Sequence, residues 1–339
     1  MTKFLVTGGA GYVGSHLVAA LLDRGAEVVV LDNLRTGHRE AVLPGAQLVI
    51  GDIADAALLD TLLADGPWEA VFHFAALSLV GESMRDPLRY LGDNAGKGMR
   101  LIQACVRHGV TRFVLSSTAA VFGEPEQVPI PEDARFAPTS PYGESKLMLE
   151  RALHWAGQTH GLRSAVLRYF NAAGADPAGR LGENHDPETH LIPLAIDAAL
   201  GRRPPLTVFG TDYPTPDGTC IRDYVHVSDL ADAHLLALRQ LDGGSVTYNL
   251  GNGEGHSVRA VIDAVEAVLG SPVPIISGER RSGDPAVLVA SSARIKADTR
   301  WSPRLPELHR IVESAAAWRK AHPAGSLNQA AESVSGTQG

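Results

Sequence analysis

Apolar and polar residues divide the chain into two parts with different patterns. Up to about residue 171, short runs that are apolar nearly throughout alternate with longer segments of helical periodicity. Such runs are typical of parallel strands that helices cover on both faces, so the pattern predicts an α/β fold with a Rossmann-type, doubly wound parallel sheet. The expected strands are Phe4–Thr7, Glu27–Leu31, Gln47–Ile50, Ala70–Phe74, Arg112–Ser116 and Ala165–Tyr169, and the helices are Gly14–Arg24, Ala57–Ala64, Asn94–His108 and Tyr142–Thr159.

The alternation ends after Asn171. Residues 172–190 are rich in Gly, Pro, Asp and His and predict a loop, whereas residues 191–321 mix helices with short strand-like pieces. We therefore expect three parts: an NAD-binding Rossmann domain over 1–171, a smaller mixed α/β substrate domain over 172–324 that exchanges some segments with the first, and a disordered tail over 325–339. The helices expected in the second part are Leu191–Leu200, Val227–Leu241, Val258–Leu269 and Leu308–His322.

A glycine-rich stretch joins the first expected strand to the first helix. Gly8, Gly11 and Gly14 recur every third residue. Glycines there let backbone N–H groups approach a pyrophosphate, and the helix N-terminus adds partial positive charge. The second strand ends about 20 residues further on, at Asp32, whose carboxylate suits ribose hydroxyls and repels a 2′-phosphate. The pattern favours NAD over NADP, although Arg35 stands close enough to receive that phosphate.

Two other strand ends carry residues suited to a dinucleotide. Asp52 follows the third strand, where it either contacts the adenine ring or caps the next helix. Small residues in Phe74-Ala75-Ala76, at the end of the fourth strand, let the backbone approach a cofactor.

Tyr142 and Lys146 stand four residues apart in a helix that we expect to begin after Ser140-Pro141. A tyrosine with its ordinary pKa of about 10 is a poor base at neutral pH. A neighbouring ammonium and a nicotinamide cation both favour the phenolate, so we expect a lowered pKa and a catalytic base. Thr118 follows the fifth strand, at the sheet edge where ligands bind, and its hydroxyl is a candidate proton relay.

Composition excludes several other classes. The net charge is −8 and basic runs are absent, which excludes generic nucleic-acid binding. Two cysteines exclude a disulfide framework and favour the cytoplasm, and no apolar run is long enough to span a bilayer. We expect no metal, because His185 and His190 stand five apart in a loop without recognisable ligand spacing.

Together these motifs resemble the extended short-chain dehydrogenase/reductase family, and within it the UDP-hexose 4-epimerases, over nearly the whole chain. The segments that carry the resemblance are residues 73–83, 140–146, 167–171, 213–219 and 222–226. It implies a cytoplasmic, homodimeric isomerase of galactose metabolism that retains NAD and interconverts UDP-galactose and UDP-glucose through a transient 4-keto sugar.

The resemblance also assigns residues by position. The cofactor is expected to meet Gly8, Gly11, Tyr12, Val13, Gly14, Asp32, Asn33, Asp52, Ile53, Phe74, Ala75, Ala76, Asn94, Tyr142, Lys146 and Phe170. The UDP-sugar is expected to meet Thr118, Tyr142, Asn171, Leu191, Thr207, Phe209, Arg222, Arg281 and Asp284. Three positions bear on the match: some members carry lysine at Ser78, asparagine is common at His190, and Leu288 falls near the position that limits sugar size.

Other activities on the same fold remain alternatives. A 4,6-dehydratase needs an additional acid and base after the threonine, but Ala119-Ala120 follow Thr118. A sister epimerase of UDP-N-acetylhexosamine, UDP-pentose or UDP-uronate fits the same motifs. A net dehydrogenase would need an exchangeable cofactor. A non-catalytic nucleotide-binding regulator is the alternative of a different class, and it would not require the Tyr/Lys pair.

Overall fold

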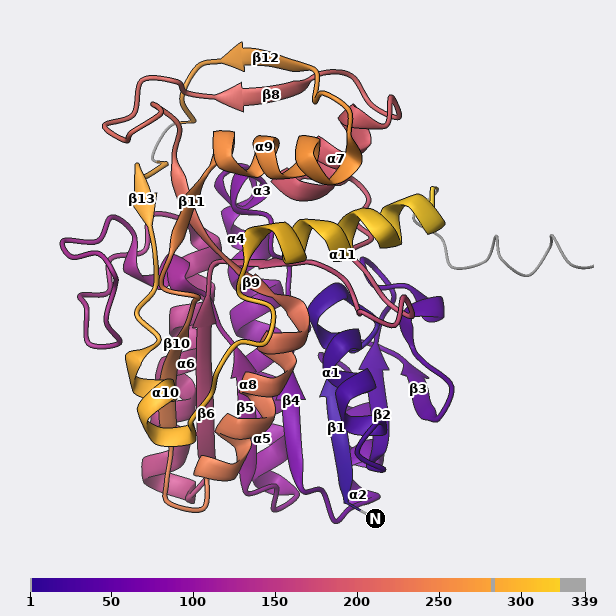
Figure 1. Ribbon diagram of the computed structural model, residues 1–339. Helices are drawn as coiled ribbons and strands as arrows, with labels where there is room; N and C mark the ends of the chain where they lie inside the picture. The colour runs from indigo at the N-terminus through magenta and orange to yellow at the C-terminus, as the bar shows by residue number, and fades with distance from the viewer. Residues whose placement is uncertain (1, 282–283, 324–339) are drawn as a thin grey trace, which may run out of the picture.

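The computed structural model describes residues 2–281 and 284–323 and is built around one large sheet covered by helices on both faces (Figure 1). The seven strands are parallel in the order β10-β6-β5-β4-β1-β2-β3, which confirms the predicted α/β class. Their bounds are β1 Lys3–Thr7, β2 Glu27–Asp32, β3 Ala46–Ile50, β4 Ala70–His73, β5 Arg112–Ser116, β6 Arg163–Tyr169 and β10 Val246–Leu250.

Alternate side chains of each strand enter two separate cores, as the pleat of a strand requires. Phe4 and Val6 of β1 pack against α1 (Tyr12–Leu22) and α8 (Val227–Gln240). Leu5, between them, faces the opposite core. That core is closed by α2 Ala56–Ala64, α5 Lys97–Arg107 and α6 Pro141–His160. Burial on both faces explains why these strands lack polar alternation.

Segments after residue 171 complete the first sheet. The strand β10 pairs with β6 at the sheet edge, and α8 packs on the same face as α1. The sequence analysis did not predict β10. Its run Val-Thr-Tyr-Asn-Leu contains polar residues, and the amide nitrogen of the buried Asn249 donates to the Ile130 carbonyl at 2.9 Å.

A smaller layered unit lies above the carboxyl edge of the large sheet. Figure 1 shows α7 (Leu191–Ala199) and α9 (Val258–Leu269) between the two-stranded ribbon β8–β12 and the rest of the chain. With α11 (Leu308–Ala321), these helices form a third core. The shorter elements are β7 Asn171–Ala173, β8 Leu206–Phe209, β9 Ile221–His226, β11 Gly255–Ser257, β12 Ile275–Gly278, β13 Val287–Leu288, α3 Val80–Arg85, α4 Pro87–Tyr90 and α10 Ala293–Thr299.

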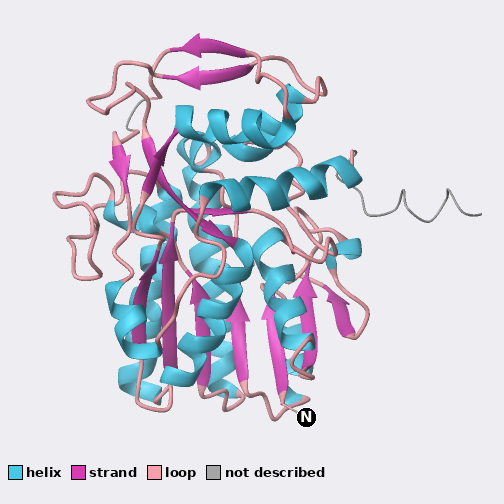
Figure 2. Cartoon of the chain, in the orientation of Figure 1, coloured by secondary structure: helices cyan, strands magenta, loops and turns pink. Residues whose placement is uncertain are grey.

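Loops lie at the carboxyl ends of the strands and between the two units (Figure 2). Helix α6, which presents Tyr142, begins as the sequence predicts, with Ser140 accepting a hydrogen bond from the Gly143 N–H and Pro141 in the first turn. It ends at Gly161, whose φ of 71° is left-handed. None of the helices in residues 2–281 and 284–323 has the length and apolar character that crossing a membrane requires. The expected tail over 325–339 lies outside the described residues.

Candidate active site

The glycine loop forms a cradle that tolerates no side chain at two positions. A Cβ on Gly8, whose φ is +76°, would lie 2.4 Å from the backbone nitrogen of Ala75. A Cβ on Gly14 would lie 2.2 Å from the Gly8 carbonyl oxygen. Helix α1 begins at Tyr12 with Gly11 as its cap and without a side-chain cap, which leaves its first N–H groups for an anionic ligand. The cradle therefore fits the pyrophosphate of NAD.

Asp32 holds the loop from the end of β2. Its carboxylate accepts hydrogen bonds from the Ala10 N–H at 3.0 Å and the Leu34 N–H at 2.9 Å. Burial raises the pKa of this carboxyl, although those two hydrogen bonds act in the opposite direction. Arg35, the candidate partner of a 2′-phosphate, pairs with Asp93 at 3.2 Å. This pairing fits the preference for NAD over NADP.

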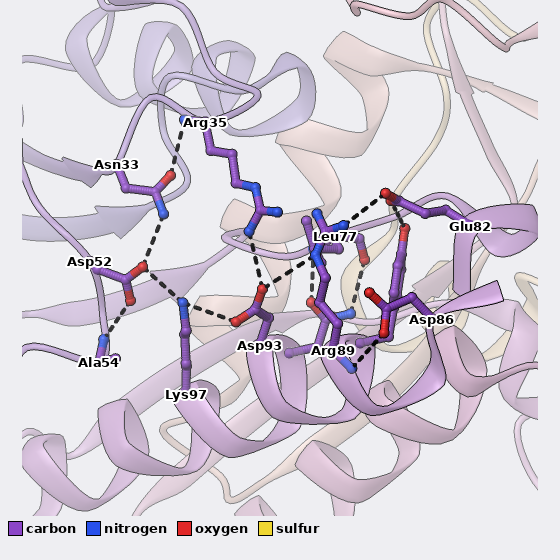
Figure 3. A network of polar contacts seen from close by, with 12 residues as sticks. Asn33, Arg35, Asp52, Ala54, Leu77, Glu82, Asp86, Arg89, Asp93 and Lys97 are labelled. Atoms are coloured by element: carbon purple, nitrogen blue, oxygen red, sulfur yellow. Dashed lines mark hydrogen bonds and ion pairs between the residues drawn. The ribbon is translucent and has the colours of Figure 1, made fainter. Parts of the chain in front are cut away.

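A polar network continues from β2 along the adenosine side of the predicted cofactor site (Figure 3). The Asn33 amide donates to Asp52 at 3.1 Å, and Lys97 reaches Asp52 at 2.9 Å and Asp93 at 3.0 Å. Burial alone would raise the pKa of Asp52, but its hydrogen bonds from Lys97, Ala54 and Asn33 lower it overall. The sequence analysis missed Lys97, because only the fold brings α5 beside the end of β3.

Asn94 connects the loop after β4 to the catalytic helix. It lies in a π-helical turn, Leu91–Gly96, a geometry frequent at functional sites. Its amide donates to the Leu77 carbonyl at 2.9 Å and to Ser145 Oγ at 3.1 Å, and its oxygen accepts from the Leu77 N–H. Ser145 Oγ in turn donates to the Tyr142 carbonyl at 2.7 Å. Asn94 thus fixes the first turn of α6 against the cofactor loop.

The remaining residues assigned to the cofactor lie beside the same edge of the sheet. Val13 is in the first turn of α1, and Phe170 joins β6 to β7. Ile53 is buried just after β3. Phe74, Ala75 and Ala76 follow β4, where the N–H groups of Phe74 and Ala75 both donate to the Thr7 carbonyl.

Tyr142 and Lys146 both lie in the first two turns of α6. The Lys146 ammonium is 2% exposed and donates to the Ser116 carbonyl at 2.8 Å. Burial lowers the pKa of Lys146 to about 8, and the charge of Glu150 opposes this shift. Burial raises the pKa of Tyr142, whereas a hydrogen bond with Thr118 lowers it. The lowered pKa expected from the sequence is therefore not found in the protein alone, because desolvation of the phenolate outweighs its neighbours.

A buried ion pair lies one turn below Lys146 and was not expected from the sequence. Arg168 of β6 contacts the Glu150 carboxylate at 2.6 Å, and Ser117 donates to the same carboxylate. Arg168 also donates to the Glu132 carbonyl at 3.1 Å, so its charge is well satisfied. Glu150 sits one helical turn from Lys146, which places a negative charge close to the ammonium. We assign this pair a positioning role.

Five of the residues predicted to meet the UDP-sugar line one cavity of about 290 Å³ between α7, β8 and the start of α9, together with Arg203 and several apolar side chains. They are Leu191, Thr207, Phe209, Arg281 and Asp284. The guanidinium of Arg281 lies over the Phe209 ring, 4.3 Å from its centre. An apolar wall with a cation at its rim suits a nucleobase joined to a diphosphate.

The other predicted substrate residues lie on β9, on β7, after β5 and on α6, and do not line this cavity. Arg222 of β9 is hydrogen-bonded to Asp284, so the two arginines and one carboxylate form a group beside the cavity. Asn171 of β7 donates to the Asp223 carbonyl at 3.1 Å. Thr118 follows β5 and accepts from the Ala120 N–H at 3.1 Å. The structure thus places the predicted sites for the uridine end and for proton transfer in different units of the fold.

A parallel sheet with a glycine cradle at its carboxyl edge and a buried Tyr/Lys pair defines a dinucleotide-dependent enzyme of the Rossmann class. Residues 4–251 match the model of the NAD dependent epimerase/dehydratase family. This chain belongs to that family.

Relatives and solved structures cover nearly all of the chain. A UDP-glucose 4-epimerase of Azospirillum brasilense is 53% identical over 94% of this chain and 92% of its own length. The structure of a UDP-glucose 4-epimerase from Brucella ovis in complex with NAD superposes with a TM-score of 0.91 at 44% identity, covering 94% and 98% of the two chains. The Bifidobacterium longum enzyme of the same name, in complex with NAD⁺ and UDP, gives a TM-score of 0.91 at 34% identity over 96% and 100%.

Proposed function

We propose that this chain is an isomerase that carries out the NAD-dependent 4-epimerisation of UDP-galactose to UDP-glucose through a transient 4-keto sugar. The observation that carries the proposal is the position of the Tyr142 hydroxyl, which is hydrogen-bonded with Thr118. Tyr142 shares its helix with the buried Lys146, and both residues lie at the carboxyl edge of the sheet that carries the pyrophosphate cradle. Ala119 and Ala120, which follow Thr118, provide no further acid or base for a dehydration.

The proposed chemistry divides the work between the two ends of the substrate. Tyr142 takes the proton of the sugar 4-hydroxyl and returns it after the keto sugar has presented its other face, with Thr118 relaying the proton. NAD, when bound, supplies reversible hydride acceptance. The cavity beside Arg222 and Arg281 holds the uridine diphosphate throughout, so the hexose turns without leaving. Lys146 donates to the Ser116 carbonyl at the sheet edge, and its positive charge on the same helix favours the phenolate form of Tyr142.

The first prediction concerns activity without added NAD. Purified protein incubated with UDP-galactose and no added NAD should form UDP-glucose, because a retained cofactor is regenerated in each cycle. Separation of the two sugar nucleotides by chromatography measures the product. Absence of product both with and without added NAD would refute the epimerase proposal, and product only with added NAD would refute cofactor retention.

A parallel assay with UDP-N-acetylgalactosamine separates this proposal from that of a sister epimerase. Leu288 of β13 lies opposite Arg222 of β9 and packs with Phe170 against a core that also contains Phe122. Its side chain therefore belongs to the wall next to the proposed sugar site. Turnover of the acetylated sugar at a rate similar to UDP-galactose would favour the broader specificity.

A second prediction concerns the proton relay. Thr118→Val should lower kcat about 10-fold with little change in KM. This factor corresponds to the loss of one hydrogen bond that stabilises the transition state by about 1.4 kcal/mol. Thr118→Ser keeps the hydroxyl and should restore most of the rate. Steady-state kinetics on the two variants measures the difference, and equal activity of Thr118→Val and the unmodified enzyme would remove Thr118 from the mechanism.

We also propose, from the family resemblance, that the enzyme acts in the cytoplasm as a homodimer with the UDP-sugar as its small-molecule partner. Sedimentation analysis of the untagged protein tests the dimer. A monomer at micromolar concentration would contradict it.

A further inference from the structure

Two glutamates and two histidines converge in the loop between β7 and α7. Glu183, His185, Glu188 and His190 each offer a ligand atom, and these atoms all lie within 4.8 Å of one another. The sequence predicted no metal, because the two histidines stand five apart in a segment without regular structure. The fold of the loop brings these four side chains together, although their spacing in the sequence does not indicate a metal site.

The distances within this four-residue cluster are short and mutual. His190 Nδ1 lies 2.9 Å from both Glu183 Oε1 and Glu188 Oε1. His185 Nδ1 lies 3.3 Å from Glu183 Oε1 and 3.8 Å from Glu188 Oε2. Ligand bonds of about 2.0–2.2 Å in a tetrahedral zinc site place neighbouring ligand atoms about 3.3 Å apart. The observed separations of 2.9, 3.3 and 3.8 Å lie on both sides of that value.

Three of the four ligand atoms have no polar partner among the described residues beyond the cluster itself. They are Glu183 Oε1, His185 Nδ1 and Glu188 Oε2, all buried. The two glutamates are only 5% and 6% exposed. Buried polar atoms that face only one another are uncommon, and three of them gathered around one point fit a central cation. An ion at the centre would satisfy all three at once.

We propose that this cluster is a binding site for a divalent transition-metal cation of the zinc type. Imidazole nitrogens with carboxylate oxygens in a four-coordinate arrangement favour zinc or cobalt, whereas magnesium and calcium prefer oxygen ligands and higher coordination numbers. When the cation displaces the ring protons to solvent, two carboxylates and two neutral imidazoles balance the charge of one dication. A cavity of about 570 Å³, lined by Gly11, Tyr12, His185 and Glu188, gives the ion a route to the cluster.

The site would join the two units of the fold. The His185 ring meets the Tyr12 ring edge-on at 6.0 Å, and Tyr12 follows directly on the glycine cradle. His190 is the residue before the first turn of α7, which lines the proposed uridine cavity through Leu191. A bound cation would therefore hold the loop between the cofactor cradle and α7. Its role would be structural, since none of the four residues approaches Tyr142 or Lys146 in the contacts of the described residues.

Cobalt(II) titration of the untagged, chelator-treated holoenzyme tests the proposal independently of epimerase activity. We expect one cobalt per chain, visible absorption of tetrahedral intensity, and displacement of cobalt by zinc. Glu183→Gln and His185→Gln should each weaken binding at least 10-fold. His38→Gln is the matched control, because His38 contacts the Asn184 carbonyl at 3.1 Å in the same loop but offers no ligand to the cluster.

Two further readouts keep the test decisive even if a variant folds poorly. Cobalt bound to the unmodified protein should produce paramagnetically shifted N–H proton resonances from two histidine rings, and zinc should raise the thermal unfolding temperature. The proposal is overturned if the unmodified protein shows no saturable cobalt binding, if the shifted ring resonances are absent, or if Glu183→Gln binds as tightly as the unmodified protein. Unchanged NAD content would show that the variants retain the cofactor cradle.

Discussion

Tyr142→Phe is expected to lower kcat for UDP-galactose about 10²- to 10⁴-fold, the usual contribution of a positioned general acid–base group. Phenylalanine fills the same space on α6, so the helix and the bound nucleotide should remain in place. Only the hydroxyl that exchanges the proton with the sugar is removed. Steady-state kinetics should show the loss in kcat, and calorimetric titration with UDP should give an affinity within about 3-fold of the unmodified protein.

A second tyrosine provides the matched control for this substitution. Tyr248 of β10 is fully buried, and its hydroxyl donates to Asp298 at 3.0 Å. That contact lies on α10, away from α6. Tyr248→Phe should reduce stability by about 1 kcal/mol, the value of one hydrogen bond, and leave kcat nearly unchanged. Near-normal turnover in Tyr142→Phe, or an equal loss in both variants, would contradict the assignment of Tyr142.

The electrostatics of the proposed catalytic pair predict a second role for the cofactor besides accepting hydride. Burial raises the pKa of Tyr142 and lowers that of Lys146 to about 8, so the empty site favours a neutral phenol. Neither shift helps proton abstraction. The positive nicotinamide of NAD, when bound, would favour the phenolate, so we expect the site to become basic when the oxidised cofactor is present. Proton transfer would then be coupled to the state in which hydride can be accepted.

The sequence was sufficient for features that follow from local rules. Continuous apolar runs predicted six of the seven parallel strands, and the glycine spacing predicted the cradle that Gly8 and Gly14 form. The helix start at Ser140-Pro141 was also correct. Each of these depends on neighbours in the chain, such as the pleat of a strand or the cap of a helix.

Features that depend on contacts between residues far apart in the chain could not be predicted from the sequence. The strand β10 carries polar residues whose partners lie more than a hundred positions away, as the Asn249–Ile130 hydrogen bond shows. Glu150 and Arg168 pair only because α6 packs on β6. The carboxylates and imidazoles of the 183–190 loop converge through an irregular backbone that no periodicity describes. Charged residues in these positions look like ordinary surface residues until the fold buries them.

Lowering the pH from 6.5 to 5 is expected to destabilise the protein steeply through its buried histidines. Burial lowers the pKa of His16, His226 and His234 to about 4 and that of His73 to about 3. In the unfolded chain these rings titrate near 6.5. Between these values the unfolded state binds more protons, so the free energy of unfolding falls as the pH falls.

The size of this effect follows from counting the groups that titrate. Each buried histidine costs about 1.4 kcal/mol per pH unit below its unfolded pKa. Asp223 acts in the opposite direction below pH 6, because burial raises its pKa to about 6 and the folded state then takes up the proton. Three net protons remain, which gives a loss of about 4 kcal/mol between pH 6 and 5. Burial would lower the pKa values of His185 and His190, but their contacts with Glu183 and Glu188 raise them to about 9 and 10. These two rings are therefore charged in the folded state and largely charged in the unfolded state below pH 6, and they add little to the slope. Ordinary carboxyl groups titrate below this window.

Urea unfolding at intervals between pH 7.5 and 5 measures the slope, and one pair of variants assigns it. His234 is fully buried, with Nδ1 2.7 Å from the Leu230 carbonyl, whereas His154 is exposed on α6. His234→Gln removes one buried titrating ring, so the slope should fall by about 1.4 kcal/mol per pH unit even if the variant is less stable at every pH. His154→Gln should leave the slope unchanged. A free energy of unfolding that stays constant from pH 6.5 to 5 would mean that these rings are already charged in the folded protein, and the packing of His73 and His234 in the two cores would then need another explanation.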